Sequence, residues 1–336
     1  MKHIKEYIPG ILLTIILALI AMYISQTIPM HLISASVFAL IFGMLLNPLT
    51  IKYTGFTKGI KFVSKLILRL SIVLMGLTLS FSQVLSVGAY SLIVMTFTLL
   101  AAFGGGYGLG KLFKMNWKLS SLISAGTGIC GGSAVAAIAP TIDADDKDIA
   151  YAISATFIFD IFMVLLFPLA GRYFGMSDMG YGLWTGTAVN DTSSVVAAGY
   201  AFSDEAGAYS VIVKLTRTLS IIPTVLIFSF IHSKQKGLLK VNKKQKVNIK
   251  KIFPYFILLF LLMVSIKSTG FISDSFSKSI SSYSKFMMIM ALGAIGLKTN
   301  FKEVAHSGLK PMLHGLIIST LVVVVSFVVQ LFLGQI

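Results

Sequence analysis

Charged residues are scarce in this chain of 336 residues: they make up 12% of the composition, while hydrophobic residues make up 56%. An average soluble domain carries about 25% charged and about 45–50% apolar residues. A chain with a mean hydropathy of +0.88 has too little polar surface to cover a fold that faces water on all sides. The composition therefore excludes a soluble globular protein and predicts one that crosses a membrane many times.

Cysteine is nearly absent, because Cys130 is the only one in the chain. A single thiol excludes an internal disulfide and a metal site built from several thiolates. The five histidines show no metal-ligand spacing, so we expect neither a metal nor a cofactor. The sequence also lacks the zinc-helix motif His-Glu-x-x-His and the nucleophile motif Gly-x-Ser-x-Gly. We therefore do not expect an enzyme.

Arginine is rare as well, since only three of the 28 basic residues are arginine, and the net charge of +16 comes from lysines. Most of these lysines lie in short loops between apolar segments, where they indicate membrane orientation rather than nucleic-acid binding. If the N-terminus is cytoplasmic, the cytoplasmic loops hold most of them. We therefore expect the N-terminus inside and the C-terminus outside, with the lipid bilayer as a partner and no nucleic acid. The sequence allows a homodimer but gives no oligomeric state.

Long apolar runs, in contrast, are abundant. A helix needs about 20 apolar residues to cross a bilayer, and the alternating ten-residue segments of a membrane β-barrel are missing. We therefore predict an all-α polytopic membrane protein with about 11 transmembrane helices. The runs lie at residues 8–26, 31–47, 64–80, 88–110, 119–140, 149–171, 180–201, 208–231, 252–268, 284–300 and 311–334.

Two of these runs are unusual. The fifth, at 119–140, contains four glycines between Gly126 and Gly132, and a continuous helix with so many glycines is unfavourable. The tenth, at 284–300, is short and is interrupted by two glycines. Short or glycine-broken apolar segments at matching positions in two halves are typical of discontinuous helices at a transport site. We therefore expect spans five and ten to be the broken helices.

Spans two to six and seven to eleven make two halves of five helices, and the odd number inverts one half relative to the other. A short sequence repeat, SAVAA at 133–137 and SVVAA at 194–198, relates span five to span seven. We refer to it as the echo. In this scheme those two spans run in the same direction, so we do not expect them to be inverted partners. The single integral membrane domain, 1–336, then divides into an extra N-terminal helix at 1–30, a first repeat at 31–172, and a second repeat at 173–336 with a basic cytoplasmic loop at 232–251.

Four ionisable residues fall well inside the predicted spans, where charged groups are costly and functional by default. Asp160 and Asp191 are candidates for coupling to H⁺ or Na⁺. Lys214 and Arg217 are three residues apart on one helix face and are candidates for holding an anion, since a guanidinium fork matches oxyanions and an ammonium supplies a point charge. The alternative for all four is ion pairing across the helices, which would be structural.

The glycine cluster of span five adds a second reason to expect an anion. A half-helix that starts near Gly131 would direct backbone N–H groups and a positive dipole end into the membrane. The alternative is close helix packing through small residues. The predicted substrate-binding residues are Thr127, Gly128, Gly131, Gly132, Ser133, Asn190, Thr192, Ser193, Lys214 and Arg217, and the predicted coupling-ion residues are Asp160 and Asp191.

Four segments resemble the motifs of the YeiH family, a bacterial inner-membrane family whose members are described as sulfate exporters. The segments are GICGGSA at 128–134, GTAVNDTSSVVAAG at 186–199, KLTR at 214–217 and GLKT at 296–299. The resemblance covers essentially the whole chain, and one departure is Asn190, where many members have histidine. It implies a location in the bacterial cell membrane. The family is distantly similar to the sodium–proton antiporter and bile-acid symporter superfamily, which implies inverted five-helix repeats with two crossing discontinuous helices.

We therefore predict a secondary transporter driven by a gradient, because the chain has no ATP-binding motif. The expected substrate is a small anion, with sulfate or a related sulfur oxyanion as the best guess. One alternative is a non-transporting membrane sensor or assembly subunit, which would show no saturable flux. The other is an anion channel, whose flux cannot be driven uphill.

Overall fold

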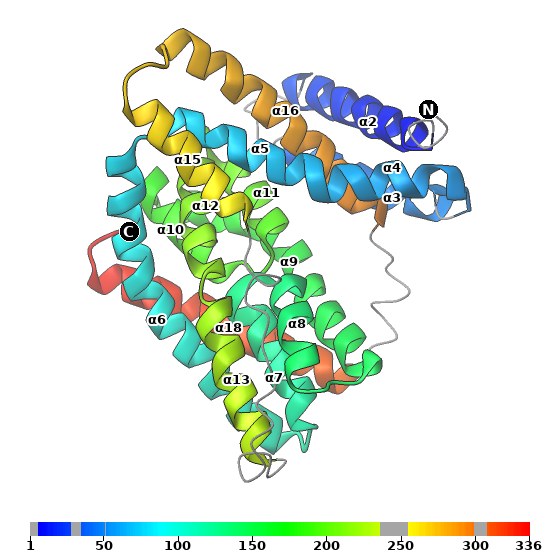
Figure 1. The fold of residues 1–336 in the computed structure, drawn as a ribbon, viewed down its shortest axis with the longest axis vertical. Coiled ribbons are helices and arrows are strands. Elements are labelled where there is room, and N and C mark those ends of the chain that lie inside the picture. Colours follow the sequence, from blue (N-terminus) through cyan, green and yellow to red (C-terminus); the bar gives the residue numbers. More distant parts are fainter. Residues whose placement is uncertain (1–5, 28–34, 51, 236–254, 299–307) are drawn as a thin grey trace.

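The computed structural model describes residues 6–27, 35–50, 52–235, 255–298 and 308–336, and within these ranges the chain is helical and has no β-strand (Figure 1). Six helical segments there are long and apolar enough to cross a membrane. They are Ile8–Thr27, Phe81–Leu112, Lys147–Tyr173, Asp204–His232, Ser275–Lys298 and Leu309–Phe332. The all-helical, multi-pass character predicted from composition is confirmed.

Figure 1 shows the helices in two groups. The flanking layer consists of α2 (Ile8–Thr27), α3 (Ala35–Thr50), η2 (Thr54–Phe56), α4 (Thr57–Phe62), η3 (Val63–Ile67), α5 (Leu68–Met75), η4 (Gly76–Thr78), α15 (Phe256–Ser268) and α16 (Asp274–Lys298). The hairpin bundle consists of α6 (Phe81–Leu112), α7 (Trp117–Ala125), η5 (Gly126–Cys130), α8 (Gly132–Ile138), η6 (Ala139–Thr141), α9 (Asp146–Tyr173), α10 (Asp178–Ala188), α11 (Thr192–Phe202), α12 (Asp204–Thr218), α13 (Ile221–Gln235) and α18 (Leu309–Phe332).

Side-chain caps fix where several helices of the hairpin bundle begin. Ser80 and the residue three positions later form a capping box at the start of α6. Asn116 caps α7, Ser177 caps α10, Asp191 caps α11 and Ser203 caps α12, each by accepting a hydrogen bond from a backbone N–H group of the first turn. Such caps satisfy N–H groups that have no partner within the helix. The breaks in the bundle are therefore encoded locally.

The tenth span is not broken at its glycines, in the part up to Lys298 that the structure describes. α16 is one continuous helix of 25 residues, and its glycines lie at a close contact with α3. A Cβ atom on Gly43 of α3 would be 2.4 Å from the carbonyl oxygen of Gly293, and the Asn47 side chain donates to the carbonyl oxygen of Leu297 at 2.8 Å. Small residues allow such close approach of two backbones. The predicted break in span ten is therefore wrong, because glycine can mark a packing face as well as an interruption.

Span five is discontinuous, as predicted, but it turns back instead of crossing. α7 and the π-helical η5 run into the bundle, the chain reverses at Gly131, and α8 with η6 returns. The two ends of the segment lie together: Asn116 Nδ2 donates to Asp148 Oδ2 at 3.2 Å, and the Lys118 ammonium donates to the carbonyl oxygen of Asp143. We call residues 117–141 hairpin 1.

Span seven, for which the hydropathy pattern predicts an unbroken crossing, is a second hairpin. α10 ends at Ala188 and α11 begins at Thr192. Its ends also lie together, because the Ser203 hydroxyl donates to the Asp178 carboxylate. We call residues 178–202 hairpin 2. Spans five and seven, and not five and ten, are therefore the discontinuous pair.

The two hairpins enter the bundle from opposite ends. α9, a helix of 28 residues, begins beside the ends of hairpin 1 and finishes beside the ends of hairpin 2. The returning arms α8 and α11 therefore run in opposite directions. The echo at 133–137 and 194–198 falls on these two arms, so it relates inverted elements. The expectation that these segments run in the same direction is wrong, because it assumed that both spans cross.

Turning two spans into hairpins reduces the crossings by two and moves the acidic stretch 143–148 to the same side as Asn116. Each hairpin removes one crossing, and removing two leaves the termini on opposite sides of the membrane. The predicted orientation with the C-terminus outside is therefore unaffected and stays a prediction. The predicted repeats, 31–172 and 173–336, each contribute helices to both the flanking layer and the hairpin bundle.

Candidate functional site

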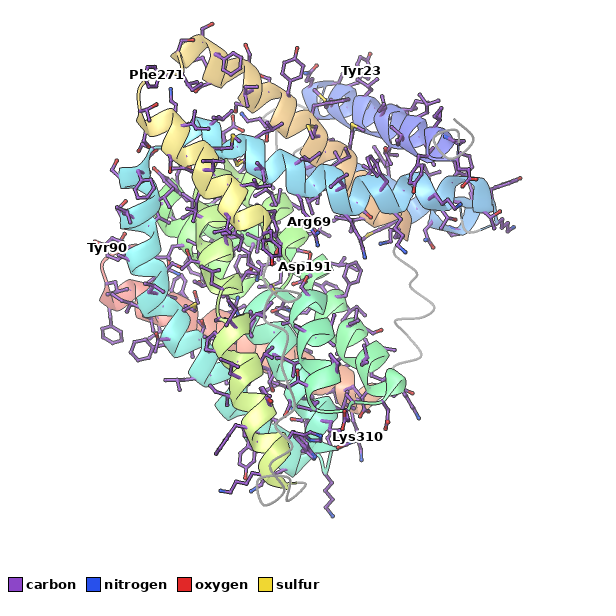
Figure 2. The ribbon with its side chains drawn as sticks, viewed as in Figure 1. Tyr23, Arg69, Tyr90, Asp191, Phe271 and Lys310 are labelled. Carbon is purple, nitrogen blue, oxygen red and sulfur yellow. The ribbon has the colours of Figure 1, made fainter. Side chains whose placement is uncertain are left out.

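The tips of the two hairpins meet inside the bundle, and Figure 2 shows Asp191 close to the boundary with the flanking layer. Gly131, at the tip of hairpin 1, has a φ of +63°. A Cβ atom there would lie 3.0 Å from Oδ1 of Asp191, at the tip of hairpin 2. Only glycine adopts this backbone conformation without strain and leaves this space. The reversal and the contact between the tips therefore depend on the same residue.

Lys214 and Arg217, both on α12, hold the two tips together. The Lys214 ammonium donates to the carbonyl oxygens of Ile129 and Val189, each at 2.9 Å, and to that of Asn190. An ammonium has three N–H donors, so all of them are used. Each carbonyl lies at the C-terminal end of a half-helix, where the backbone lacks partners and the dipole favours a cation.

Arg217 repeats this pattern with a wider reach. Its Nε donates to the carbonyl oxygen of Gly128 and its Nη2 to that of Thr127, both at 2.6 Å, and its Nη1 donates to that of Thr187. Both basic side chains are completely buried. An anion that bound directly to the Lys214 ammonium would have to displace one of its three bonds, and the anion-binding role predicted for the two residues from sequence stays a prediction.

Asp160, on α9, stabilises hairpin 2 at the N-terminal end of its returning arm, α11. Its two carboxylate oxygens accept the backbone N–H groups of Asn190 and Asp191, each at 2.9 Å. These groups lie just before the first turn of α11, where the helix dipole favours a negative charge. Asp160 is 1% exposed. Its contacts are those of a helix cap, and its predicted coupling role stays a prediction.

Four charges thus meet at the hairpin tips, two acidic and two basic, and their formal sum is zero. No direct ion pair joins these four described side chains; backbone peptide groups lie between them. An isolated charge is very costly in this setting. We call Asp160, Asp191, Lys214 and Arg217 the charge quartet, and its balance allows four ionisable groups to lie within the bundle.

The remaining predicted residues fall into two sets. Thr127, Gly128 and Asn190 are buried with the cations. Ser133 is exposed, and four neighbours are half-buried. We call this accessible set the rim; it comprises Gly132, Ser133, Asp191, Thr192 and Ser193. Asp191 belongs to both groups: its Oδ2 caps α11 by accepting from Ser193 N at 2.8 Å, while its side chain is reached from outside.

Two buried polar atoms at the tips have no hydrogen-bond partner among the described residues, Thr127 Oγ1 on hairpin 1 and Asn190 Oδ1 on hairpin 2. Such groups are rare in folded proteins and call for a water, an ion or a ligand. Asn190 Nδ2 also reaches Ser319 Oγ on α18, at 3.3 Å. Ser319 was missed from the sequence, because a lone serine in a long apolar span carries no signal of its own.

A small cavity lies where the rim approaches the flanking layer. Ser193 and Ser194 of α11 line it from the bundle, together with side chains of α3, α9 and α16, and its volume is about 10 Å³. That is room for about one water molecule. An oxyanion does not fit there in this conformation, so the boundary is closed.

Comparisons with known proteins identify the family of the chain. The family model described as "conserved hypothetical protein 698" matches residues 9–315. The chain belongs to this family. It is 68% identical to a UPF0324 membrane protein of Clostridium tetani over the full length of both chains. Relatives of the same name in Streptococcus agalactiae (41% identical, 98% of each chain) and Streptococcus pneumoniae (39%, 99% of each chain) extend the match.

The resemblance to YeiH-type proteins is thereby confirmed, and the chain is a multi-pass bacterial membrane protein. The names of these UPF0324 relatives state a membrane location and no activity. The substrate and the mechanism therefore have to be argued from the hairpin tips.

Proposed function

We propose that this protein is a secondary transporter of a small anion, with sulfate or a related sulfur oxyanion as the substrate and an H⁺ or Na⁺ gradient as the driving force. The observation that supports this most strongly is the meeting of two opposed hairpin tips at a charge quartet, beside a boundary between two helix groups. Discontinuous helices that end within the membrane offer unpaired backbone groups to a solute.

In this proposal the charge quartet is the frame and the rim is the binding surface. Lys214 and Arg217 donate their hydrogen bonds to carbonyl oxygens, so they fix the tips. Their charges supply positive potential to the rim from the buried side. The Ser133, Thr192 and Ser193 hydroxyls donate to the anion from the accessible side. This division follows the burial of the two sets and keeps every buried charge paired with backbone groups.

Asp191 provides the reason for coupling. Its half-buried carboxylate lies in the rim, where it would repel an incoming anion. Two like charges about 4 Å apart repel by about 4 kcal/mol at an effective dielectric constant of 20. A proton or Na⁺ bound at Asp191 removes this repulsion, so cation and anion favour each other's binding, which is the reciprocal linkage that a coupled carrier needs.

Access requires movement, because the cavity at the rim is too small for the substrate in this conformation. The flanking layer contacts the rim through α3 and α16, whereas the quartet is held entirely within the bundle. We therefore propose that the bundle shifts relative to the flanking layer as one unit and carries the rim between the two sides of the membrane.

Labelled sulfate uptake into proteoliposomes, with an imposed pH or Na⁺ gradient, tests the proposal. We expect saturable uptake that accumulates sulfate above its external concentration and that related sulfur oxyanions inhibit. Uptake that never exceeds equilibrium would indicate a channel. The absence of flux above empty liposomes, for folded protein and for a panel of small anions, would contradict transport and favour a sensor or assembly subunit.

A further inference from the structure

A second cavity lies away from the hairpin tips, between α6, α7 and α13. Its volume is about 390 Å³, which is in the usual size range of small-molecule pockets. Four aromatic residues and three serines line its walls, and two lysines stand at one end. The residues that matter here are Phe103, Tyr107, Lys111, Lys114, Trp117 and Phe228.

The cavity opens between two helices that present apolar side chains outward. Leu100 on α6 and Phe230 on α13 are 67% and 60% exposed. Such exposure would be a liability in water but is expected where a helix faces lipid. A cavity between these helices is therefore open to the hydrocarbon chains of the bilayer.

One end of the cavity is basic and has the composition of a membrane interface. Lys111 lies in the last turn of α6 with its ammonium 4.4 Å from the centre of the Tyr107 ring. Lys114, with a φ of +52°, follows the helix end, and Trp117 opens α7. Tryptophan and tyrosine favour the headgroup level of a bilayer. No acidic residue lines the cavity among the residues that the structure describes.

The neighbouring acidic groups are engaged elsewhere. Asp148 accepts a hydrogen bond from Asn116, and Asp143 contacts His232 at 3.2 Å. Among the residues that line the cavity in the described part of the chain, none is an acidic partner for the basic end, which stands beside an apolar slot that faces lipid.

We propose that this cavity binds an anionic phospholipid. One acyl chain lies against the rings of Phe103 and Phe228, which pack on each other with their centres 5.8 Å apart, and the phosphate is held by the ammonium groups of Lys111 and Lys114. Basic pockets between transmembrane helices are suited to anionic headgroups. Because the lipid would touch α7, the entering arm of hairpin 1, it would join that hairpin to both lipid-facing helices.

The two tryptophans of the chain make a direct test. Trp117 lines the cavity, whereas Trp184 is 4% exposed in the bundle and stacks on Phe167 with ring centres 4.1 Å apart. Trp184→Phe leaves Trp117 as the only reporter, and Trp117→Phe leaves the internal control. Each form is reconstituted in phosphatidylcholine vesicles that contain an equal mole fraction of brominated phosphatidylglycerol or brominated phosphatidylcholine.

We expect brominated phosphatidylglycerol to quench Trp117 at least twofold more than brominated phosphatidylcholine, and to quench Trp184 equally with it. Lys111→Ala/Lys114→Ala should abolish the difference, while Lys58→Ala/Lys61→Ala, on the remote α4, should preserve it. Ser121→Phe places a ring in the cavity and leaves both lysines, so it should narrow the cavity and reduce the excess quenching by brominated phosphatidylglycerol. Equal quenching of Trp117 by the two lipids, or an excess quenching by brominated phosphatidylglycerol that Ser121→Phe leaves undiminished, would overturn the proposal.

Discussion

At the scale of single residues, Lys214 is the group on which both hairpins depend. Its three carbonyl partners come from both tips, and its charge offsets a buried aspartate. Removing one member of a buried charge network typically costs about 3–5 kcal/mol, because the remaining groups lose their partner. We therefore expect Lys214→Met to lower the thermal unfolding midpoint of the detergent-solubilised protein markedly.

Lys58 supplies the matched control, since its ammonium pairs with Glu6 at an exposed site. Exposed pairs contribute little to stability, so Lys58→Met should leave the midpoint unchanged. An unchanged midpoint in Lys214→Met as well would refute the view that this lysine holds the tips.

Gly131 provides a second test at this scale, with its neighbour as the control. An alanine at position 131 must adopt a φ of +63° and place its Cβ against Asp191, a strain of about 1–3 kcal/mol. At Gly132 the first atom that a Cβ would meet is 3.8 Å away, on Ile153. We expect Gly131→Ala to reduce both the unfolding midpoint and the transport rate, and Gly132→Ala to keep the midpoint. Equal midpoints for the two variants would show that the tip has room to adjust.

Much of the residue-scale picture was predictable. Charges and glycines inside apolar spans mark positions that need a special environment, and Asp160, Asp191, Lys214 and Arg217 do come together. Their partners were not predictable, because a sequence does not reveal which carbonyl groups a broken helix leaves unpaired. Basic side chains inside an apolar span predict anion binding, whereas in the structure these two donate to backbone oxygens.

At the scale of elements, the distinction between a hairpin and a crossing helix decides the topology. Hydropathy measures whether about 20 residues are apolar, and both arrangements satisfy that condition. The glycines of span five revealed a break but not a reversal, and the glycines of span ten, which pack on α3, gave the same signal without a break. The short echo between spans five and seven was the better guide, because it falls on equivalent arms of the two hairpins.

Cross-linking separates the two arrangements. In a Cys130→Ala background, Asn116→Cys and Asp148→Cys place thiols where side chains already touch, so we expect a disulfide under mild oxidation, detected by peptide mass mapping. A span that crosses would hold these positions about 30 Å apart, on opposite sides of the hydrocarbon core.

The pair Asn116→Cys and Ser203→Cys, which joins the ends of hairpin 1 to those of hairpin 2, is the matched negative control and should not cross-link. A disulfide in the control but not in the first pair would contradict the hairpin assignment.

At the scale of the whole molecule, the proposed transport requires the hairpin bundle to move against the flanking layer. Lys285 of α16 and Asp204 of α12 form an ion pair across this boundary. A disulfide-containing thiol cross-linker that joins Lys285→Cys to Asp204→Cys, again without Cys130, should therefore abolish substrate flux, and a reducing agent that cleaves the linker should restore it. Full flux through the cross-linked protein would show that the two groups need not separate there.

The coupling role of Asp191 is tested most directly by Asp191→Asn. The amide oxygen retains the cap on α11, whereas the loss of charge removes both the cation site and the repulsion of the anion. Labelled sulfate is followed in proteoliposomes with and without an imposed H⁺ or Na⁺ gradient. We predict gradient-driven accumulation in the wild type, and in the variant a flux that equilibrates sulfate but no longer responds to the gradient. Accumulation driven equally well by the variant would contradict the assignment of Asp191 as the coupling residue.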